Sequence, residues 1–212
     1  MKSIYCISGF GADERVFAHL NFGNHDVHFI QWKIPENNES ITHYAQRMAS
    51  EIRDTYPILI GLSFGGMMSI EVAKIISTEK VILISSIKNY HEKPWYMRLT
   101  AYSRINKVVP IRPYSFLAPL ENYQLSVRTE EERKLVEQYR KNISPIYADW
   151  AINEIIYWKN EWQPSSLFHI HGDSDHIFPI KKLHPDFIIK GGGHMMLMNQ
   201  SEEVNLALRA IL

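Results

Sequence analysis

The stretch Pro57-Ile58-Leu59-Ile60-Gly61-Leu62-Ser63-Phe64-Gly65-Gly66-Met67 decides the fold expected for this chain. A short apolar run enters the Gly-x-Ser-x-Gly pentapeptide 61–65, and a helix-like stretch, 67–76, follows. A single serine therefore stands where a strand must turn sharply into a helix, and the glycines around it permit a strained backbone and close packing. This setting is typical of a nucleophile elbow. The alternative is a glycine-rich turn with an inert serine.

The partners that a reactive serine needs follow two later apolar runs. A serine hydroxyl is a poor nucleophile at neutral pH, so it needs a general base and a carboxylate that orients that base. The run 167–171 leads into Gly172-Asp173-Ser174-Asp175-His176, and the run 187–190 leads into Gly191-Gly192-Gly193-His194. Because the carboxyl ends of parallel strands share one edge of a sheet, the serine, an aspartate and His194 can converge there.

The order of these groups along the chain resembles the α/β-hydrolase fold family over nearly the whole chain outside residues 87–162. Ser63 matches the elbow serine, and His194 matches the histidine that follows a glycine pair. Asp175 matches the acid of the His-Gly-x-x-Asp-x-x-x-Pro segment, here 171–179, with Asp173 as the rival acid. The resemblance implies a catalytic triad of Ser63, Asp175 and His194.

The oxyanion formed by attack on a carbonyl needs two preorganised N–H donors. One should be the amide of Phe64 at the start of the helix, where unsatisfied donors point outward. The other should be the amide of Phe10, because Ser8-Gly9-Phe10-Gly11 follows the first strand and resembles the family's His-Gly-x loop. Ser8 departs from the usual histidine, which puts the hydrogen bonding of this loop in doubt.

The predicted architecture is α/β, with a mostly parallel sheet of about six strands flanked by helices. Strand-like runs lie at 3–8, 26–32, 57–61, 80–86, 166–171 and 186–190, with helical patterns between them. Such alternation implies right-handed crossovers and a parallel sheet. The first two strands of the family are missing, which would leave 26–32 at the sheet edge with Phe29 and Trp32 partly exposed. We expect a loop or a second copy of the chain to shield this edge.

The segment 87–162 is expected to form an inserted helical cap within a single domain, 1–212. It holds four of the five tryptophans and eight of the eleven tyrosines, which would line an apolar pocket or form a core of the cap itself. Within it, the range 129–141 reads as a polar helix with a solvated face.

The early cap carries five cations and no acid between Lys93 and Leu120. If these cations flank the entrance, they would favour an anionic ester or acyl thioester. The alternative is an ordinary basic surface. The cations are Lys93, Arg98, Arg104, Lys107 and Arg112.

Two other motifs suggest different chemistry. Gly9-Phe10-Gly11 after a strand invites a dinucleotide site, but Glu14 stands where the fingerprint needs a small residue. The run 169–176 resembles the histidine-rich ligand run of metallo-β-lactamase-like hydrolases, but Ser174 replaces a histidine. We therefore expect no metal and no organic cofactor.

Composition fits one compact enzyme. The chain has 212 residues, a formal net charge of zero and a single cysteine, so nothing draws it globally to nucleic acid and no internal disulfide can form. The sequence shows no signal peptide and no apolar run of membrane-spanning length, which predicts a cytoplasmic protein. The predicted function is hydrolysis of a small ester or thioester through an acyl-enzyme. The alternatives are a fold-mate that binds a small molecule without turnover, and a lyase.

Overall fold

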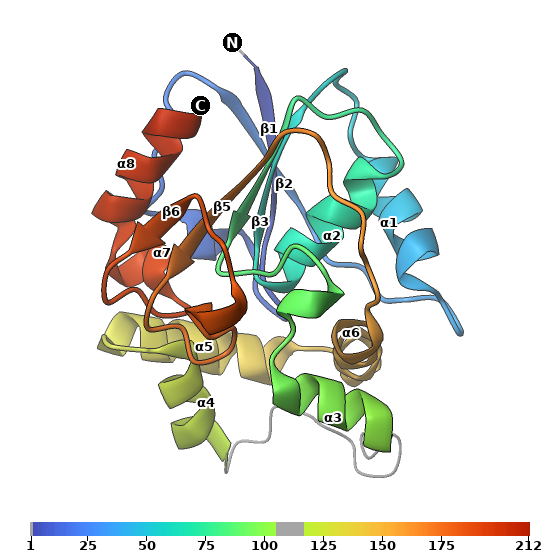
Figure 1. Cartoon of the computed structure of the whole chain (residues 1–212), viewed down its shortest axis with the longest axis vertical. Coiled ribbons are helices and arrows are strands. Elements are labelled where there is room, and N and C mark those ends of the chain that lie inside the picture. Colours follow the sequence, from blue (N-terminus) through green and yellow to red (C-terminus); the bar gives the residue numbers. More distant parts are fainter. Residues whose placement is uncertain (1, 105–116) are drawn as a thin grey trace.

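A computed structural model describes residues 2–104 and 117–212, whose strands form one parallel sheet (Figure 1). The strands lie in the order β2-β1-β3-β4-β5-β6. Their bounds are β1 Ser3–Ile7, β2 Asp26–Ile30, β3 Ile58–Leu62, β4 Lys80–Ile84, β5 Leu167–Gly172 and β6 Phe187–Ile189. The predicted parallel sheet of about six strands is confirmed, and each predicted run matches one strand to within two residues at either end.

Helices cover both faces of the sheet because residues alternate sides along each strand. On one face, α1 (Ile41–Ala49) and α2 (Phe64–Ala73) pack over Tyr5, Ile7 and Leu59. On the other, α8 (Ser201–Ile211) packs over Ile4 and Cys6 (Figure 1). The two cores fix the sheet between rigid layers, so that loops at the strand ends are held in place.

The edge of the sheet is formed by β2, as the sequence predicts. Phe29 on this strand is 39% exposed and stacks on Phe17, which belongs to the short helix η1 (Glu14–Phe17). Trp32 is half-buried and packs against the core of the α1 and α2 face. A second copy of the chain on this edge stays a prediction.

Between β4 and β5, the described residues form four α-helices that lie across the carboxyl ends of the strands (Figure 1). The chain enters them through the short helix η2 (Tyr90–Glu92). They are α3 (Trp95–Ser103), α4 (Ala118–Leu125), α5 (Glu130–Asn142) and α6 (Pro145–Tyr157). Lys107 and Arg112 lie outside the described residues. The short helices η5 (Ile180–Lys182) and α7 (Met196–Asn199) complete the elements.

Within the described parts of the chain, every helix is too short or too polar to cross the hydrocarbon core of a bilayer.

Candidate active site

Ser63 lies between β3 and α2 in a backbone conformation that side chains rarely adopt, with φ 53° and ψ −117°. The three glycines around it are sterically required. A Cβ on Gly61 would collide with the backbone of Gly65, and one on Gly65 would overlap the carbonyl oxygens of Ile7 and Ser8. The sharp turn therefore packs directly on the end of β1, and its strain is held by surrounding backbone, as is common at functional sites.

His194 joins Ser63 to Asp175 in one hydrogen-bonded line. Its Nε2 lies 2.9 Å from Ser63 Oγ, and its Nδ1 lies 2.8 Å from Asp175 Oδ2. The serine comes from the end of β3, the aspartate from the loop after β5 and the histidine from the loop between β6 and α7. All three loops leave the carboxyl edge of the sheet, as the sequence analysis expects.

Asp175 is held as a buried carboxylate. Burial by itself would raise its pKa, but the charge and hydrogen bond of His194, with further help from His171 and the Phe178 amide, lower it below the usual value. Oδ1 accepts hydrogen bonds from the amides of Ile177 (2.8 Å) and Phe178 (2.9 Å). These bonds leave Oδ2 to orient the imidazole. Asp173, the rival acid, is exposed, and its Oδ1 accepts from the Gly191 amide at 2.7 Å.

Two further histidines lie buried beneath Asp175. His171 Nε2 donates to the carbonyl of Phe178 at 2.8 Å and lies 3.6 Å from Asp175 Oδ2, while its Nδ1 lies 3.1 Å from His169 Nε2. Burial lowers the pKa of both imidazoles. The histidine-rich run considered as a metal motif is therefore engaged in hydrogen bonds that support the acid loop.

The expected oxyanion donors lie on both sides of the serine. Phe64 is the first residue of α2, and neither its amide nor that of Phe10 donates to another group of the described residues. A Cβ on Gly9 would lie 3.6 Å from Ser63 Cβ, so the loop after β1 runs directly beside the serine. The loop that carries Phe10 and the start of α2 therefore both lie next to Ser63, and their role as oxyanion donors stays a prediction.

The departure at Ser8 is compensated by Trp32, a residue that sequence reasoning missed. The Ser8 hydroxyl donates to the carbonyl of Ala12 at 2.6 Å. The indole N–H of Trp32 lies 3.0 Å from both Ser8 Oγ and the carbonyl of Gly9, and its ring stacks on Phe64 at 5.1 Å. Trp32 thus contacts both segments that carry the expected oxyanion donors, the loop after β1 and the start of α2.

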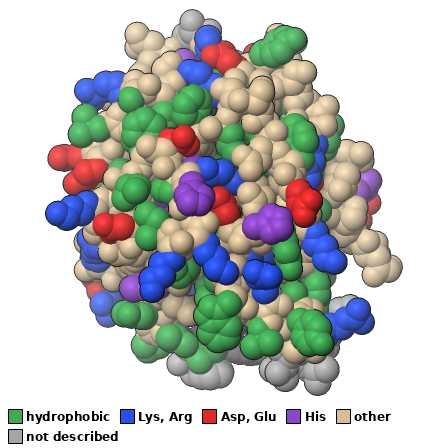
Figure 2. Space-filling model, viewed as in Figure 1, with side chains coloured by type: hydrophobic (Ala, Val, Ile, Leu, Met, Phe, Trp, Pro, Cys, Tyr) green, Lys and Arg blue, Asp and Glu red, His purple; other side chains and the backbone are tan. Residues whose placement is uncertain are grey.

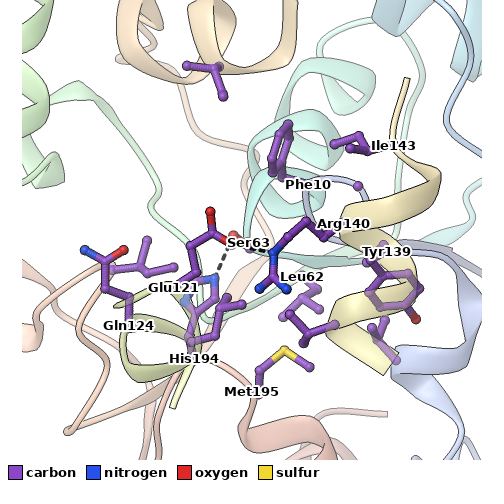
Figure 3. Close-up of a pocket in the computed structure, with 18 residues that line it drawn as sticks. Phe10, Leu62, Ser63, Glu121, Gln124, Tyr139, Arg140, Ile143, His194 and Met195 are labelled. Carbon is purple, nitrogen blue, oxygen red and sulfur yellow. Dashed lines mark hydrogen bonds and ion pairs between the residues drawn. The ribbon is translucent and has the colours of Figure 1, made fainter. Parts of the chain in front are cut away.

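A cavity of about 270 Å³ opens above Ser63 and His194 (Figure 3). Its walls come from the loop after β1, from α4, α5 and α6, and from the loops carrying Asp175 and His194. Most lining side chains are apolar, and the polar exceptions beside the site residues are mainly on α4 and α5. The lining includes Phe10, Val16, Leu62, Glu121, Gln124, Leu125, Val136, Tyr139, Arg140, Ile143, Ile152, Ile177 and Met195.

The helix expected to be only a solvated face also lines this cavity. Helix α5 does present an exposed pair, Glu137 with Lys141. Its opposite side, however, carries three lining residues, Val136, Tyr139 and Arg140, and Ile143 directly after the helix end is a fourth. Counted from the first of them, these residues stand at positions i, i+3, i+4 and i+7, the spacing of one face of a helix. This spacing predicts an inward face, which the many charged residues of the segment made hard to recognise.

The described cations of the early cap do not line the cavity. Lys93 is fully buried and donates to the carbonyl of Ile156 at 2.7 Å, which corrects its assignment to a basic surface. Arg98 stacks over Tyr90, with 5.4 Å between the guanidinium carbon and the ring centre. Figure 2 shows Lys and Arg side chains across the lower half of one face, beside histidine and acidic side chains.

The turn between α4 and α5 is bonded to the segment that carries His194. The amide of Met195 donates to the carbonyl of Leu125 at 3.1 Å, and Asn199 donates to that of Ser126 at 3.2 Å. Arg128 donates to the carbonyl of Gly191 at 2.6 Å. The segment that joins α4 to α5 and the histidine loop therefore share direct contacts.

One cluster of potential metal ligands occurs among the described residues, away from this site. Glu36, Glu39 and His43 bring ligand atoms within 4.8 Å of one another. Arg47 pairs with both carboxylates, at 3.6 Å from Glu36 and 2.6 Å from Glu39. The positive charge of Arg47 therefore balances these carboxylates where a metal ion would otherwise do so.

The sheet order, the elbow and the Ser-His-Asp line define an α/β-hydrolase fold, and solved structures share it over the whole chain. A bromoperoxidase from Bacillus anthracis is 20% identical, with a TM-score of 0.71 over 99% of this chain and 91% of that one. A thermophilic esterase from Thermogutta terrifontis is 17% identical, with a TM-score of 0.72 over 99% and 89%. An epoxide hydrolase from Bacillus megaterium is 14% identical, with a TM-score of 0.70 over 100% and 93%. No protein-family model and no curated protein matches the sequence.

Proposed function

We propose that this protein is a serine hydrolase that cleaves a small ester or thioester through an acyl-enzyme. The observation that carries the proposal is the continuous line of hydrogen bonds from Ser63 through His194 to Asp175 at the base of an apolar cavity. Esterases and a lactonase among the structures of the same fold support the broader class of hydrolase. Because one fold can host several chemistries, the residues of the site and not the fold carry the assignment of ester hydrolysis.

The first half of the reaction forms the acyl-enzyme. Ser63 Oγ attacks the substrate carbonyl carbon while its proton passes to His194 Nε2, and the carbonyl electron pair moves onto the oxygen. The amides of Phe10 and Phe64 stabilise that oxyanion. The tetrahedral intermediate collapses, the bond to the alcohol or thiol breaks, and His194 returns the proton to the leaving group.

The second half releases the acid by the same route. A water gives its proton to His194 as its oxygen bonds to the acyl carbon, and collapse of the intermediate restores the Ser63 hydroxyl. Asp175 stays ionised throughout, holds the Nδ1–H tautomer and stabilises the imidazolium. The low pKa of Asp175 suits this role, because a protonated acid could not stabilise that cation.

Labelling with a fluorophosphonate tests the proposal directly. The intact protein should gain one adduct on Ser63, seen as a mass shift, while Ser63→Ala and His194→Ala should stay unlabelled. Ser174→Ala is the matched control, because Ser174 is exposed in the acid loop and should not affect labelling.

A panel of nitrophenyl esters with increasing acyl length then measures turnover. Ser63→Ala should lower kcat by roughly four to six orders of magnitude, as in triad enzymes. An intact protein that takes no label and hydrolyses none of these esters would instead be a binding protein with this fold.

A further inference from the structure

Among the described residues, one ion pair, Glu121 with Arg140, interrupts the apolar wall of the cavity. Arg140 Nε on α5 lies 2.8 Å from Glu121 Oε2 on α4, and the two side chains are only 9% and 24% exposed. Figure 3 shows both side chains reaching into the cavity and meeting there. The pair thus lies in the same enclosed space as the Ser63 hydroxyl and the His194 imidazole.

Other ion pairs on α5 are placed differently. Glu137 and Lys141 are 51% and 70% exposed, and Glu130 and Arg133 are 67% and 62% exposed. Exposed pairs of this kind contribute little beyond solubility and local helix support. Burying a charge pair costs desolvation energy and is often no more stabilising than apolar packing. The Glu121–Arg140 pair is therefore better explained by a role toward what enters the cavity.

The hydrogen-bonding capacity of Arg140 is only partly used. A guanidinium has five N–H donors. Within residues 2–104 and 117–212, Nε donates to Glu121, and Nη2 makes a long bond of 3.3 Å to Asn122. The remaining donors can bind an acceptor oxygen of a ligand. Glu121 neutralises the positive charge, so the pair offers hydrogen bonds without attracting an anion.

Building on the proposed hydrolase function, we propose that Glu121 and Arg140 select uncharged acyl groups that carry a hydrogen-bond acceptor such as an ether or amide oxygen. The acyl chain packs on the apolar walls, and its acceptor binds the guanidinium. The cavity of about 270 Å³ leaves room beside the ion pair for a short acyl chain. An acyl group ending in a carboxylate is disfavoured, because Glu121 already occupies Arg140.

Three nitrophenyl esters of equal length test this selectivity: a hexanoate, its analogue with one methylene replaced by an ether oxygen, and an analogue ending in a carboxylate. The wild-type protein should prefer the ether over the hexanoate and turn over the carboxylate ester worst. Arg140→Met should reduce the ether preference about tenfold, the scale of one hydrogen bond to a charged donor. The change should appear mainly in KM.

Glu121→Gln provides the sharper variant. The glutamine oxygen can still accept from Arg140 Nε, so the contact between α4 and α5 is kept while the cavity gains one positive charge. The ratio of kcat/KM for the carboxylate ester to that for the hexanoate should rise at least about tenfold, the equivalent of about 1.4 kcal/mol. Because the readout is a ratio of two kcat/KM values, a change in turnover that is common to both esters cancels.

Glu137→Gln and Arg133→Met are the matched controls, because they make the same replacements on the exposed side of α5. Both should keep the wild-type ratios. If Glu121→Gln hydrolyses both esters and keeps the wild-type ratio, the selectivity proposal is overturned while the hydrolase proposal stands. If the wild-type protein neither hydrolyses an ester nor takes the fluorophosphonate, the hydrolase proposal itself fails. If Arg140→Met does not fold, Glu121→Gln decides.

Discussion

Replacing Lys93 by methionine should change how the stability of the protein depends on pH. Lys93, in the short link from η2 to α3, is fully buried, and its amine donates to the carbonyl of Ile156 on α6. Burial, reinforced by the nearby charge of Lys159, lowers its pKa from 10.5 to about 7. At about 1.4 kcal/mol for each pH unit, this fall corresponds to about 5 kcal/mol of preference for the neutral amine in the folded state. Below pH 7 the folded protein must keep this ammonium buried.

The sign of the effect follows from proton uptake on unfolding. Between pH 7 and 10.5 the folded lysine is neutral and the unfolded lysine is protonated, so the unfolded state binds more protons and stability rises with pH. From pH 6.5 to 9 this group alone should add about 3 kcal/mol to the wild-type free energy of unfolding. Lys93→Met lacks the group and should not show this rise.

Urea denaturation followed by tryptophan fluorescence at several pH values measures the difference. The free energy of unfolding of Lys93→Met minus that of the wild type should fall by about 3 kcal/mol from pH 6.5 to 9. The lost hydrogen bond to Ile156 adds a constant offset, because a neutral amine and an ammonium both donate it. Lys141→Met, at a 70% exposed position, is the control. Parallel curves for Lys93→Met and the wild type would show that Lys93 titrates normally and would refute the reasoning.

Three further variants test the architecture of the site. Gly65→Ala should destabilise the protein by about 3 kcal/mol in urea denaturation, because the new methyl group overlaps the backbone oxygens of Ile7 and Ser8 at the end of β1, which cannot move aside; wild-type stability would contradict the elbow packing. Asp175→Asn should lower kcat about 10⁴-fold on a nitrophenyl ester by presenting the wrong tautomer, while Asp173→Asn should stay within a few-fold of wild type; equal losses would mean that the acid is misassigned. Trp32→Phe should lower kcat about tenfold with little change in KM, because it removes the indole donor from the loop after β1; an unchanged kcat would separate that brace from catalysis.

The sheet and the Ser-His-Asp line could be predicted because they depend on local pattern and on one topological rule. Each strand is a short apolar run, and parallel strands deliver their following polar residues to the same edge. Sequence position alone therefore brings Ser63, Asp175 and His194 together. Asp175 could be separated from Asp173 only by family resemblance, since both follow β5 closely.

The cavity wall could not be predicted in the same way, because it depends on how helices dock. Trp32 was expected near an exposed edge, but the chain after β2 turns back and places its indole under the loop at Ser8 and Gly9. Arg140 lies on a helix whose charges suggested a solvated face. Lys93 belongs to a basic stretch yet is fully buried and donates to the carbonyl of Ile156 on α6. In each case a tertiary contact overrides the local polarity of the sequence.

The hydrogen bonds between the α4–α5 turn and the histidine segment link entry into the cavity to the position of His194 beside Ser63. The carbonyls of Leu125 and Ser126 accept hydrogen bonds from Met195 and Asn199, on the segment that carries His194. Arg128 donates to the carbonyl of Gly191, before that histidine. A rigid outward movement of that turn would break those hydrogen bonds or displace the His194 imidazole from Ser63. A substrate must then enter by a path that keeps these hydrogen bonds intact. Otherwise, each outward movement of the α4–α5 turn would also remove His194 from Ser63 and inactivate the site.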